Sequence, residues 1–296
     1  MISDPLPQTE SWPQLGPPPG WYADPWRWAW WRWWDGYRWT PHLYGPYGPY
    51  GLAAPAPFVP KGPGIKGGGI AAIGIGIGFV ASIAVAIVFF AAQSGHLDDR
   101  NPWYMLVSQL ALWAGFLGAV VVASRRNGTG SLARDYGLAW PKWHDLTAGF
   151  AGGVLGRLPS TLILILIVVA NNGFNTPSSA GRQIDGLTPE GTAGWIIMGL
   201  FLVVGAPFVE ELLFRGLIQG AFTRRLGATP AIFVTALIFC FAHVFNEGPL
   251  APFILFPPAI ILGYLRHRSG KLAPGMIAHS TFNAIAFALL LVPAFR

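Results

Sequence analysis

From Gly67 onward the chain is a succession of apolar segments, and this pattern limits the fold more than any other feature. We place the segments near residues 68–92, 103–124, 146–170, 193–222, 229–246, 250–266 and 272–292. A hydrocarbon layer about 30 Å thick is crossed by about 20 helical residues, and a spanning helix satisfies its own backbone hydrogen bonds. The sequence therefore predicts an all-α polytopic membrane protein with about seven transmembrane helices.

The composition agrees with a lipid environment. Hydrophobic residues make up 53% of the chain and charged residues only 11%, whereas soluble domains carry about 25% charged residues. The net charge of +6 comes without a long run of Lys and Arg, so we expect membrane lipid and no nucleic acid as a partner. A single cysteine, Cys240, excludes an intramolecular disulfide. Nothing in the sequence specifies an oligomeric state.

The first part of the chain is of a different kind. Residues 1–43 are rich in Trp and contain Pro-Gly-Trp-Tyr-Ala-Asp-Pro and Arg-Trp-Trp-Asp-Gly-Tyr-Arg-Trp-Thr, with Asp35-Gly36 as a hairpin-turn signal. This pattern resembles a short Trp-rich module of unknown function found beside membrane spans in bacterial proteins. Residues 44–66 are rich in Pro, Gly and Tyr and predict a flexible linker. We assign 67–296 to the transmembrane domain and expect no secretory signal peptide.

The charges between the apolar segments predict an orientation. The basic residues that fall in alternate loops are Arg125, Arg126, Arg134, Lys142, Arg224, Arg225, Arg266, Arg268 and Lys271. The other loops, around Asp98 and between Asp185 and Glu190, are acidic or nearly neutral. Because basic loops stay in the cytoplasm, we expect a multi-pass protein of the cell membrane with a cytoplasmic amino terminus and an external carboxyl terminus.

Polar and charged groups inside a bilayer are costly, so each one is a candidate for function. The candidates within the apolar segments are Arg157, Glu210, Glu211, Arg215, His243, His279 and Asn283. Glu211 and Arg215 are four residues apart, with the acid first, which favours an ion pair within a helix and a supporting role. Glu210 lies about 100° around the helix and has no partner in its own turn, so it is free for chemistry.

The remaining candidates fall at similar depths. Counted along helices from the basic loops, Glu210, His243, His279 and Asn283 lie about 12 to 27 Å inward. His279 and Asn283 share one helix face, and Phe239 stands one turn from His243. Three separate helices thus direct polar groups to one level, which predicts a shared buried or water-filled cavity.

Three motifs in order carry a resemblance. Glu-Glu-x-x-x-Arg at 210–215, Phe-x-x-x-His at 239–243 and His-x-x-x-Asn at 279–283 resemble the motifs of the type II CAAX prenyl protease and bacteriocin-processing family, also called CPBP or Abi. The resemblance covers about 190–290, with an extension back to about 100, and the motif positions show no departure. It implies an intramembrane endopeptidase that takes a peptide or a lipidated peptide.

The resemblance also implies roles. Glu210, aided by His243, would activate water, and His279 with Asn283 would stabilise the oxyanion, while the neighbouring ion pair would support the site. The donor set could also supply Zn²⁺ ligands, although the compact His-Glu-x-x-His motif is absent. The family has been described both as metalloproteases and as glutamate-dependent hydrolases, so the metal stays open; if one is used, its ligands come from Glu210, His243 and His279.

Two other functions fit part of the pattern. A non-catalytic immunity or partner-binding membrane protein could keep the same fold. A proton-linked transporter also places Glu, His and Arg within the membrane, but it should show two related halves, which this sequence lacks. A thiol protease based on Cys240 has no base at a suitable spacing. Arg157, beside Pro159, is either a counter-ion or the mark of a helix break.

Overall fold

The computed structural model describes residues 17–26, 29, 31–35, 39–45, 48–50, 63–170, 189, 191–244 and 248–291. The chain divides into two compact units, Met1–Ala56 and Pro57–Arg296. Each unit is described by itself.

The first unit is a small antiparallel sheet. Its strands are β1 (Gly20–Ala23), β2 (Trp31–Trp34), β3 (Trp39–Gly45) and β4 (Gly48–Tyr50), in the order β1-β2-β3-β4. Strands β2 and β3 flank the predicted turn at Asp35-Gly36, of which residue 36 lies outside the described residues. The end of β3 and all of β4 fall within the range 44–66 that we predicted as linker, so the sheet extends further than the Trp-rich pattern indicated.

The two faces of this sheet differ. On one face Arg32 is buried, pairs with Asp24 through Nε and Oδ1 at 2.9 Å, and lies over the Trp26 ring. On the other face Trp31 and Tyr44 are paired across the strands and remain more than 40% exposed. A buried ion pair under aromatic rings substitutes for the aliphatic core that so short a segment cannot build.

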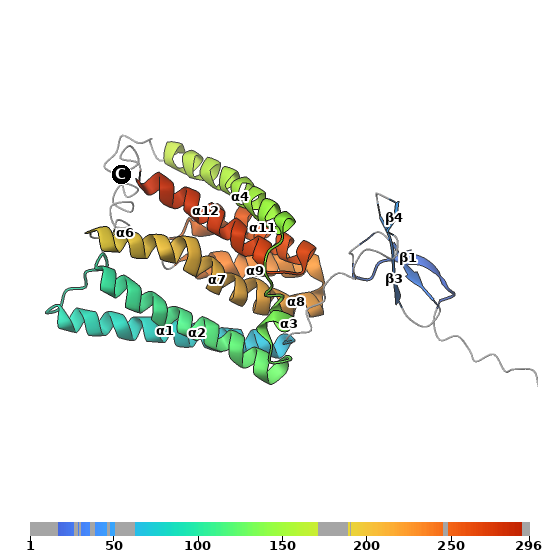
Figure 1. Cartoon of the computed structure of the whole chain (residues 1–296), viewed down its shortest axis with the longest axis horizontal. Coiled ribbons are helices and arrows are strands. Elements are labelled where there is room, and N and C mark those ends of the chain that lie inside the picture. Colours follow the sequence, from blue (N-terminus) through green and yellow to red (C-terminus); the bar gives the residue numbers. More distant parts are fainter. Residues whose placement is uncertain are drawn as a thin grey trace, which may run out of the picture. The chain divides into compact units, whose positions relative to one another are not determined.

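The second unit is helical (Figure 1). Its elements are α1 (Ile65–Ala92), α2 (Pro102–Asn127), α3 (Leu132–Tyr136), α4 (Trp143–Ala170), α6 (Gly191–Leu200), η1 (Phe201–Gly205), α7 (Ala206–Glu210), η2 (Glu211–Ile218), α8 (Gln219–Leu226), α9 (Ala228–Ala242), α11 (Ala251–Ser269) and α12 (Ala273–Leu291). The two η elements are π-helical turns within one continuous rod from Gly191 to Leu226. Over the described residues, each apolar segment predicted from the sequence is largely helical, which confirms the helical membrane fold.

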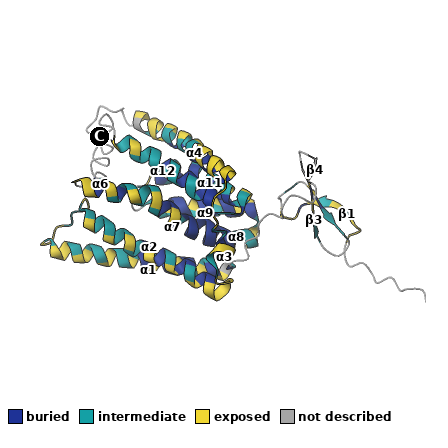
Figure 2. Ribbon diagram, in the orientation of Figure 1, coloured by how far each residue is buried: buried dark blue, intermediate teal, exposed yellow. Residues whose placement is uncertain are grey.

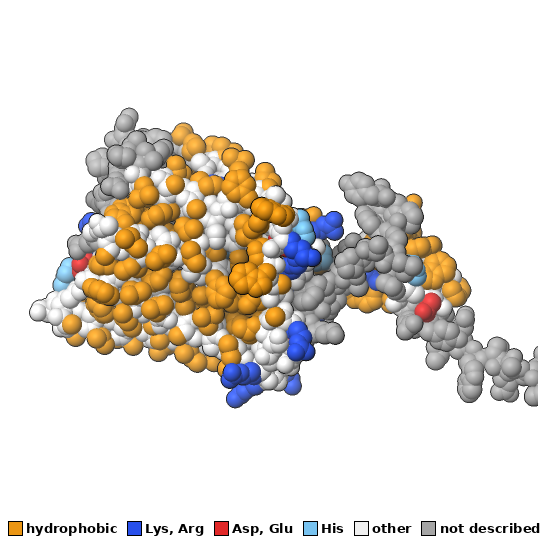
Figure 3. Space-filling model, in the orientation of Figure 1, with side chains coloured by type: hydrophobic (Ala, Val, Ile, Leu, Met, Phe, Trp, Pro, Cys, Tyr) orange, Lys and Arg blue, Asp and Glu red, His pale blue; other side chains and the backbone are white. Residues whose placement is uncertain are grey.

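Length and composition support a multi-pass membrane protein. Among the described residues, five helical stretches are long and apolar enough to cross a bilayer: Lys66–Ala92, Pro102–Asn127, Trp143–Ile167, Gly191–Leu226 and Ala273–Leu291. Helix α9 is apolar but shorter, so the prediction of seven spans depends on α9 and α11. Hydrophobic side chains cover much of the visible surface of the helical unit, and Lys and Arg gather near α3 and α8 (Figure 3).

Burial within the helical unit is uneven. Buried residues concentrate toward the α3 and α8 end, and exposed or half-buried ones toward the α1–α2 loop (Figure 2). All residues of η2 are buried, and Tyr136 of α3 is fully buried, with its hydroxyl donating to the Val120 carbonyl at 2.8 Å. The end that carries the basic loops is therefore the densely packed one.

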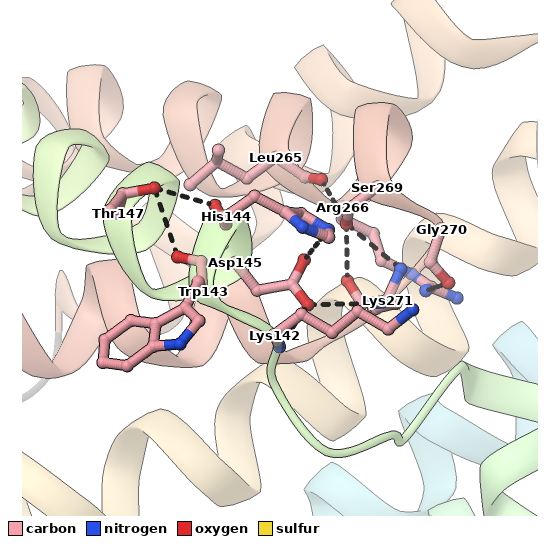
Figure 4. A network of polar contacts seen from close by, with 10 residues as sticks. All are labelled: Lys142, Trp143, His144, Asp145, Thr147, Leu265, Arg266, Ser269, Gly270 and Lys271. Carbon is pink, nitrogen blue, oxygen red and sulfur yellow. Dashed lines mark hydrogen bonds and ion pairs between the residues drawn. The ribbon is translucent and has the colours of Figure 1, made fainter.

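A polar network joins the start of α4 to the loop between α11 and α12 (Figure 4). Asp145 is 1% exposed, and its Oδ2 accepts from Lys271 Nζ and from the Lys142 backbone N–H, both at 2.8 Å. Arg266 donates to the Gly270 carbonyl in the same loop. These bonds fix the loop from which α12 begins, and α12 carries His279 and Asn283.

Glycines allow α1 and α2 to approach closely. A Cβ added at Gly115 would stand 2.5 Å from Gly78 N and would also overlap Gly74. Small residues four apart on α1 thus let two backbones touch, an arrangement common between helices in membranes.

We predict that Gly115→Ala destabilises the helical unit by about 1–3 kcal/mol, because the added methyl group has no space. Gly118→Ala is the matched control, since a Cβ there meets nothing within 4 Å. Thermal unfolding of both variants in detergent measures the difference. Equal melting temperatures for the two variants would contradict the close packing of α1 on α2.

Candidate active site

The helical rod from Gly191 to Leu226 changes geometry where its charges lie. Glu210 ends α7, and the π-helical turn η2 begins at Glu211. Single π-helical turns interrupt α-helices mostly at functional sites, because the wider turn re-aims the side chains that follow. The sequence reasoning assumed a regular α-helix here, and it therefore missed both π segments.

Glu210 lies between two imidazoles. Its Oε2 is 3.7 Å from His243 Nε2 and 3.9 Å from His279 Nε2, so the structure brings together side chains from α7, the end of α9 and α12. The Glu210 side chain is 12% exposed, and its Oε2 accepts no hydrogen bond from the described residues. A buried carboxylate oxygen facing two ring nitrogens is suited to a donor placed between them, such as a water molecule.

Glu211 and Arg215 form the ion pair that their spacing predicts. Glu211 Oε1 is 3.1 Å from Arg215 Nη1, and both side chains are at most 1% exposed. Arg215 Nη2 also donates to the Ala259 carbonyl at 3.3 Å, and its guanidinium lies 4.4 Å from the centre of the Phe239 ring. These contacts tie η2 to α9 and α11.

The two histidines are oriented by different partners. His243 Nδ1 lies 2.8 Å from the Phe239 carbonyl, which can only accept, so Nδ1 donates and Nε2 faces Glu210. His279 Nδ1 lies 3.3 Å from Glu211 Oε1. Glu211 therefore contacts a candidate catalytic ring as well as Arg215, and this contact was not predicted from the sequence.

Asn283 is held by a feature of the π-helical turn. Its Nδ2 donates to the Leu202 carbonyl at 2.7 Å. In a π-helix that carbonyl would accept from the residue five positions later, which is Pro207 and has no N–H. The side-chain amide thus takes the place of the missing backbone donor, and Asn283 also lines the cavity.

Phe239 connects the whole group. Its ring centre is 4.5 Å from that of His243 and 5.9 Å from that of His279, with Phe214 packed edge-on at 5.1 Å. The Phe-x-x-x-His spacing predicted that Phe239 lies one turn from His243, but it did not predict the contacts of Phe239 with the other helices. Arg157, left open by the sequence, lies with its guanidinium 5.1 Å from the centre of the Phe282 ring on α12.

The candidate residues line one cavity of about 890 Å³. Its lining includes Glu210, His243, His279 and Asn283 together with apolar side chains of α2, α9, α11 and α12. It also includes Asp99 of the α1–α2 loop, and Ser82, Tyr104, Ser108 and Gln109. Sequence reasoning missed the last four because isolated hydroxyl and amide residues in apolar helices carry no distinctive spacing. A mostly apolar cavity of this size with a few converging polar groups has the character of a ligand site.

The fit of a metal ion can be tested on the donor set. Among the described residues no three or more His, Cys, Asp or Glu side chains are arranged to hold a metal ion. Glu210, His243 and His279 are neighbours, but they do not form such a group in this structure. The mechanism proposed below is written for the side chains alone.

The comparison with protein families decides the class. Residues 192–285 match the family described as Type II CAAX prenyl endopeptidase Rce1-like. These residues form an Rce1-like domain. The matched range includes all three motifs, and the Rce1-like assignment confirms the resemblance seen in the sequence. At the level of class, residues 192–285 are similar to CAAX-type membrane proteases. No curated protein and no solved structure matches the chain.

In the Rce1-like domain we predict that Arg215→Met lowers stability by about 3–5 kcal/mol, because it leaves the buried Glu211 carboxylate without its cation. The double variant Glu211→Gln/Arg215→Met is the matched control and should regain part of the loss, since neither charge remains. Melting temperatures in detergent measure both. A double variant that is no more stable than Arg215→Met would show that the ion pair is not the source of the loss.

Proposed function

We propose that the protein is an intramembrane endopeptidase in which Glu210 and His243 activate a water molecule. The observation that carries this proposal is the position of Glu210 Oε2, buried, without a hydrogen-bond donor among the described residues and 3.7 Å from His243 Nε2. Two acceptors this close are both satisfied by one water that donates to each. That geometry leaves the water's lone pair free to attack a carbonyl carbon.

The reaction then proceeds in two steps. Water forms a C–O bond to the peptide carbonyl carbon and gives one proton to Glu210, while the carbonyl π electrons move to oxygen. The C–N bond next breaks, the carbonyl reforms, and the proton on Glu210 passes to the leaving amine. The products are a carboxylic acid and an amine, and Glu210 returns to its starting state.

In this proposal His279 and Asn283 hold the oxyanion. His279 Nδ1 lies 3.3 Å from Glu211 Oε1 and its Nε2 lies 3.9 Å from Glu210 Oε2, and Asn283 lines the same cavity. An N–H of either side chain would donate to the oxyanion. Donors fixed in advance in a site of low dielectric constant stabilise the negative charge more than mobile water does. Glu211 and Arg215 would act as positioning residues for His279.

The first prediction from this proposal concerns Glu210. Glu210→Gln keeps the size of the side chain but cannot take a proton from water, so we expect cleavage to fall by a factor of about 10² or more. Quenched fluorescent peptides with and without an isoprenyl thioether, in detergent micelles, provide the measurement. His243→Ala should cause a loss of the same kind.

Glu211→Gln is the matched carboxylate control. It should lower the melting temperature through the lost partner of Arg215, whereas Glu210→Gln should leave the melting temperature close to that of the wild type. Cleavage by Glu210→Gln at the wild-type rate would refute the catalytic role. A wild-type protein that cuts none of the peptides would favour the non-catalytic immunity or binding function.

The second prediction concerns metal ions. Because no step uses one, we expect cleavage to continue after prolonged treatment with a strong zinc chelator, and metal analysis of the purified protein to find less than one bound ion per chain. Loss of cleavage on chelation, with recovery on adding Zn²⁺, would assign Glu210, His243 and His279 to a metal site instead.

A further inference from the structure

The cavity has one closed end. On η2 the last residue that lines it is Phe214, and none of the described residues from Arg215 to Leu226, nor any of α3, contributes to the lining. Beyond Phe214 the packing is continuous: Leu217 is fully buried, and Gln219 Nε2 donates to the Gly263 carbonyl at 2.9 Å. The α3 and α8 end therefore seals the cavity.

Backbone contacts reinforce this seal. Tyr136 packs so closely on Gly216 that an added Cβ would stand 3.2 Å from Tyr136 Cβ. The Leu272 N–H donates to the Gly137 carbonyl at 3.1 Å, and Arg266 Nε donates to the Arg215 carbonyl at 3.4 Å. Elements α3, η2, α11 and the start of α12 are thus bonded to one another below the site.

The opposite end reaches the surface. Asp99, in the loop between α1 and α2, lines the cavity and is exposed to solvent. Along α2 the lining continues through Tyr104, Ser108 and Leu112 to Phe116. These positions are four residues apart, so one helix face runs about 18 Å from the loop toward the site. Among the described residues the cavity is open at the α1–α2 loop and closed at the basic end.

The part of the cavity that runs from the α1–α2 loop to Phe116, called the open arm below, is lined by polar as well as apolar residues. Ser82, Tyr104, Ser108 and Gln109 are among its lining residues, within otherwise apolar helices. An extended peptide inside the membrane needs partners for its own N–H and C=O groups. Polar residues within a largely apolar lining suit an unfolded peptide segment.

The two ends also differ in charge. The closed end carries Arg125 at the end of α2, Arg224 at the end of α8 and Lys271 in the loop before α12. The open end carries Asp98, Asp99 and Arg100, so that loop is slightly acidic. Basic loops stay on the cytoplasmic side of the membrane. We infer that the site receives its substrate from the non-cytoplasmic side, as an extended peptide segment of an exported or membrane protein. The substrate part of this inference rests on the proposed peptidase function.

Thiol labelling tests the direction of opening without using activity. In a Cys240→Ala background, a cysteine is introduced at Ser108, inside the arm. Leu110→Cys is the matched control on the same helix, since Leu110 is 50% exposed and does not line the cavity. His96→Cys and Asn127→Cys mark the two membrane sides. A charged, membrane-impermeant methanethiosulfonate is added to right-side-out or inverted vesicles, and unreacted thiols are then counted with a mass tag.

We expect Ser108→Cys to react in right-side-out vesicles together with His96→Cys, about tenfold faster than Leu110→Cys, because a thiol must ionise in water to react. Asn127→Cys should react only in inverted vesicles. Reaction of Ser108→Cys only in inverted vesicles, or no faster than Leu110→Cys in either, would overturn the inference. If labelling follows the expectation but wild-type protein cleaves no peptide, the opening stands and the peptide assignment fails with the proposed function.

Discussion

The ion pair between Glu211 and Arg215 is the constraint on which the rest of the site depends. Two charges buried to this extent are tolerated in a membrane only when each satisfies the other and further partners complete the shell. Arg215 obtains those partners from the Ala259 carbonyl and the Phe239 ring, and Glu211 from His279. Satisfying one pair of charges therefore fixes the relative positions of η2, α9, α11 and α12, and Glu210 is placed among the histidines as a result.

The structure separates a rigid end from an accessible one. Buried side chains and interhelical hydrogen bonds gather where α3, η2 and the loop before α12 meet, and looser packing with an open cavity lies toward the α1–α2 loop (Figure 2). The candidate site lies between these two ends. The packed end holds its polar side chains in position, and the cavity is open toward the α1–α2 loop. The proposed catalytic residues and the proposed entrance thus lie in different parts of the helices.

Much of this could be predicted from sequence where the information is local. Apolar runs of membrane length gave the helices, and a four-residue spacing was enough to pair Glu211 with Arg215 because both lie on one helix. The contact of His279 with Glu211 joins residues 68 positions apart, and no spacing encodes it. The bond from Asn283 to Leu202 depends on a π-helical turn whose one visible sign is Pro207. The Trp-rich pattern predicted strands but not their extent, because β4 has a composition typical of linkers.

The two π-helical turns limit which deletions this chain can tolerate. Each residue of an α-helix rotates the next side chain by about 100°, and a π-helical turn absorbs one extra residue without ending the helix. Loss of a single residue between Phe201 and Gly205 would leave composition, length and hydropathy almost the same. It would nevertheless rotate the Leu202 carbonyl and Glu210 relative to each other, separating Asn283, which donates to that carbonyl, from the proposed base. In this helical rod, the number of residues in each π-helical turn therefore matters as well as their identity, because it sets the direction of the side chains that follow.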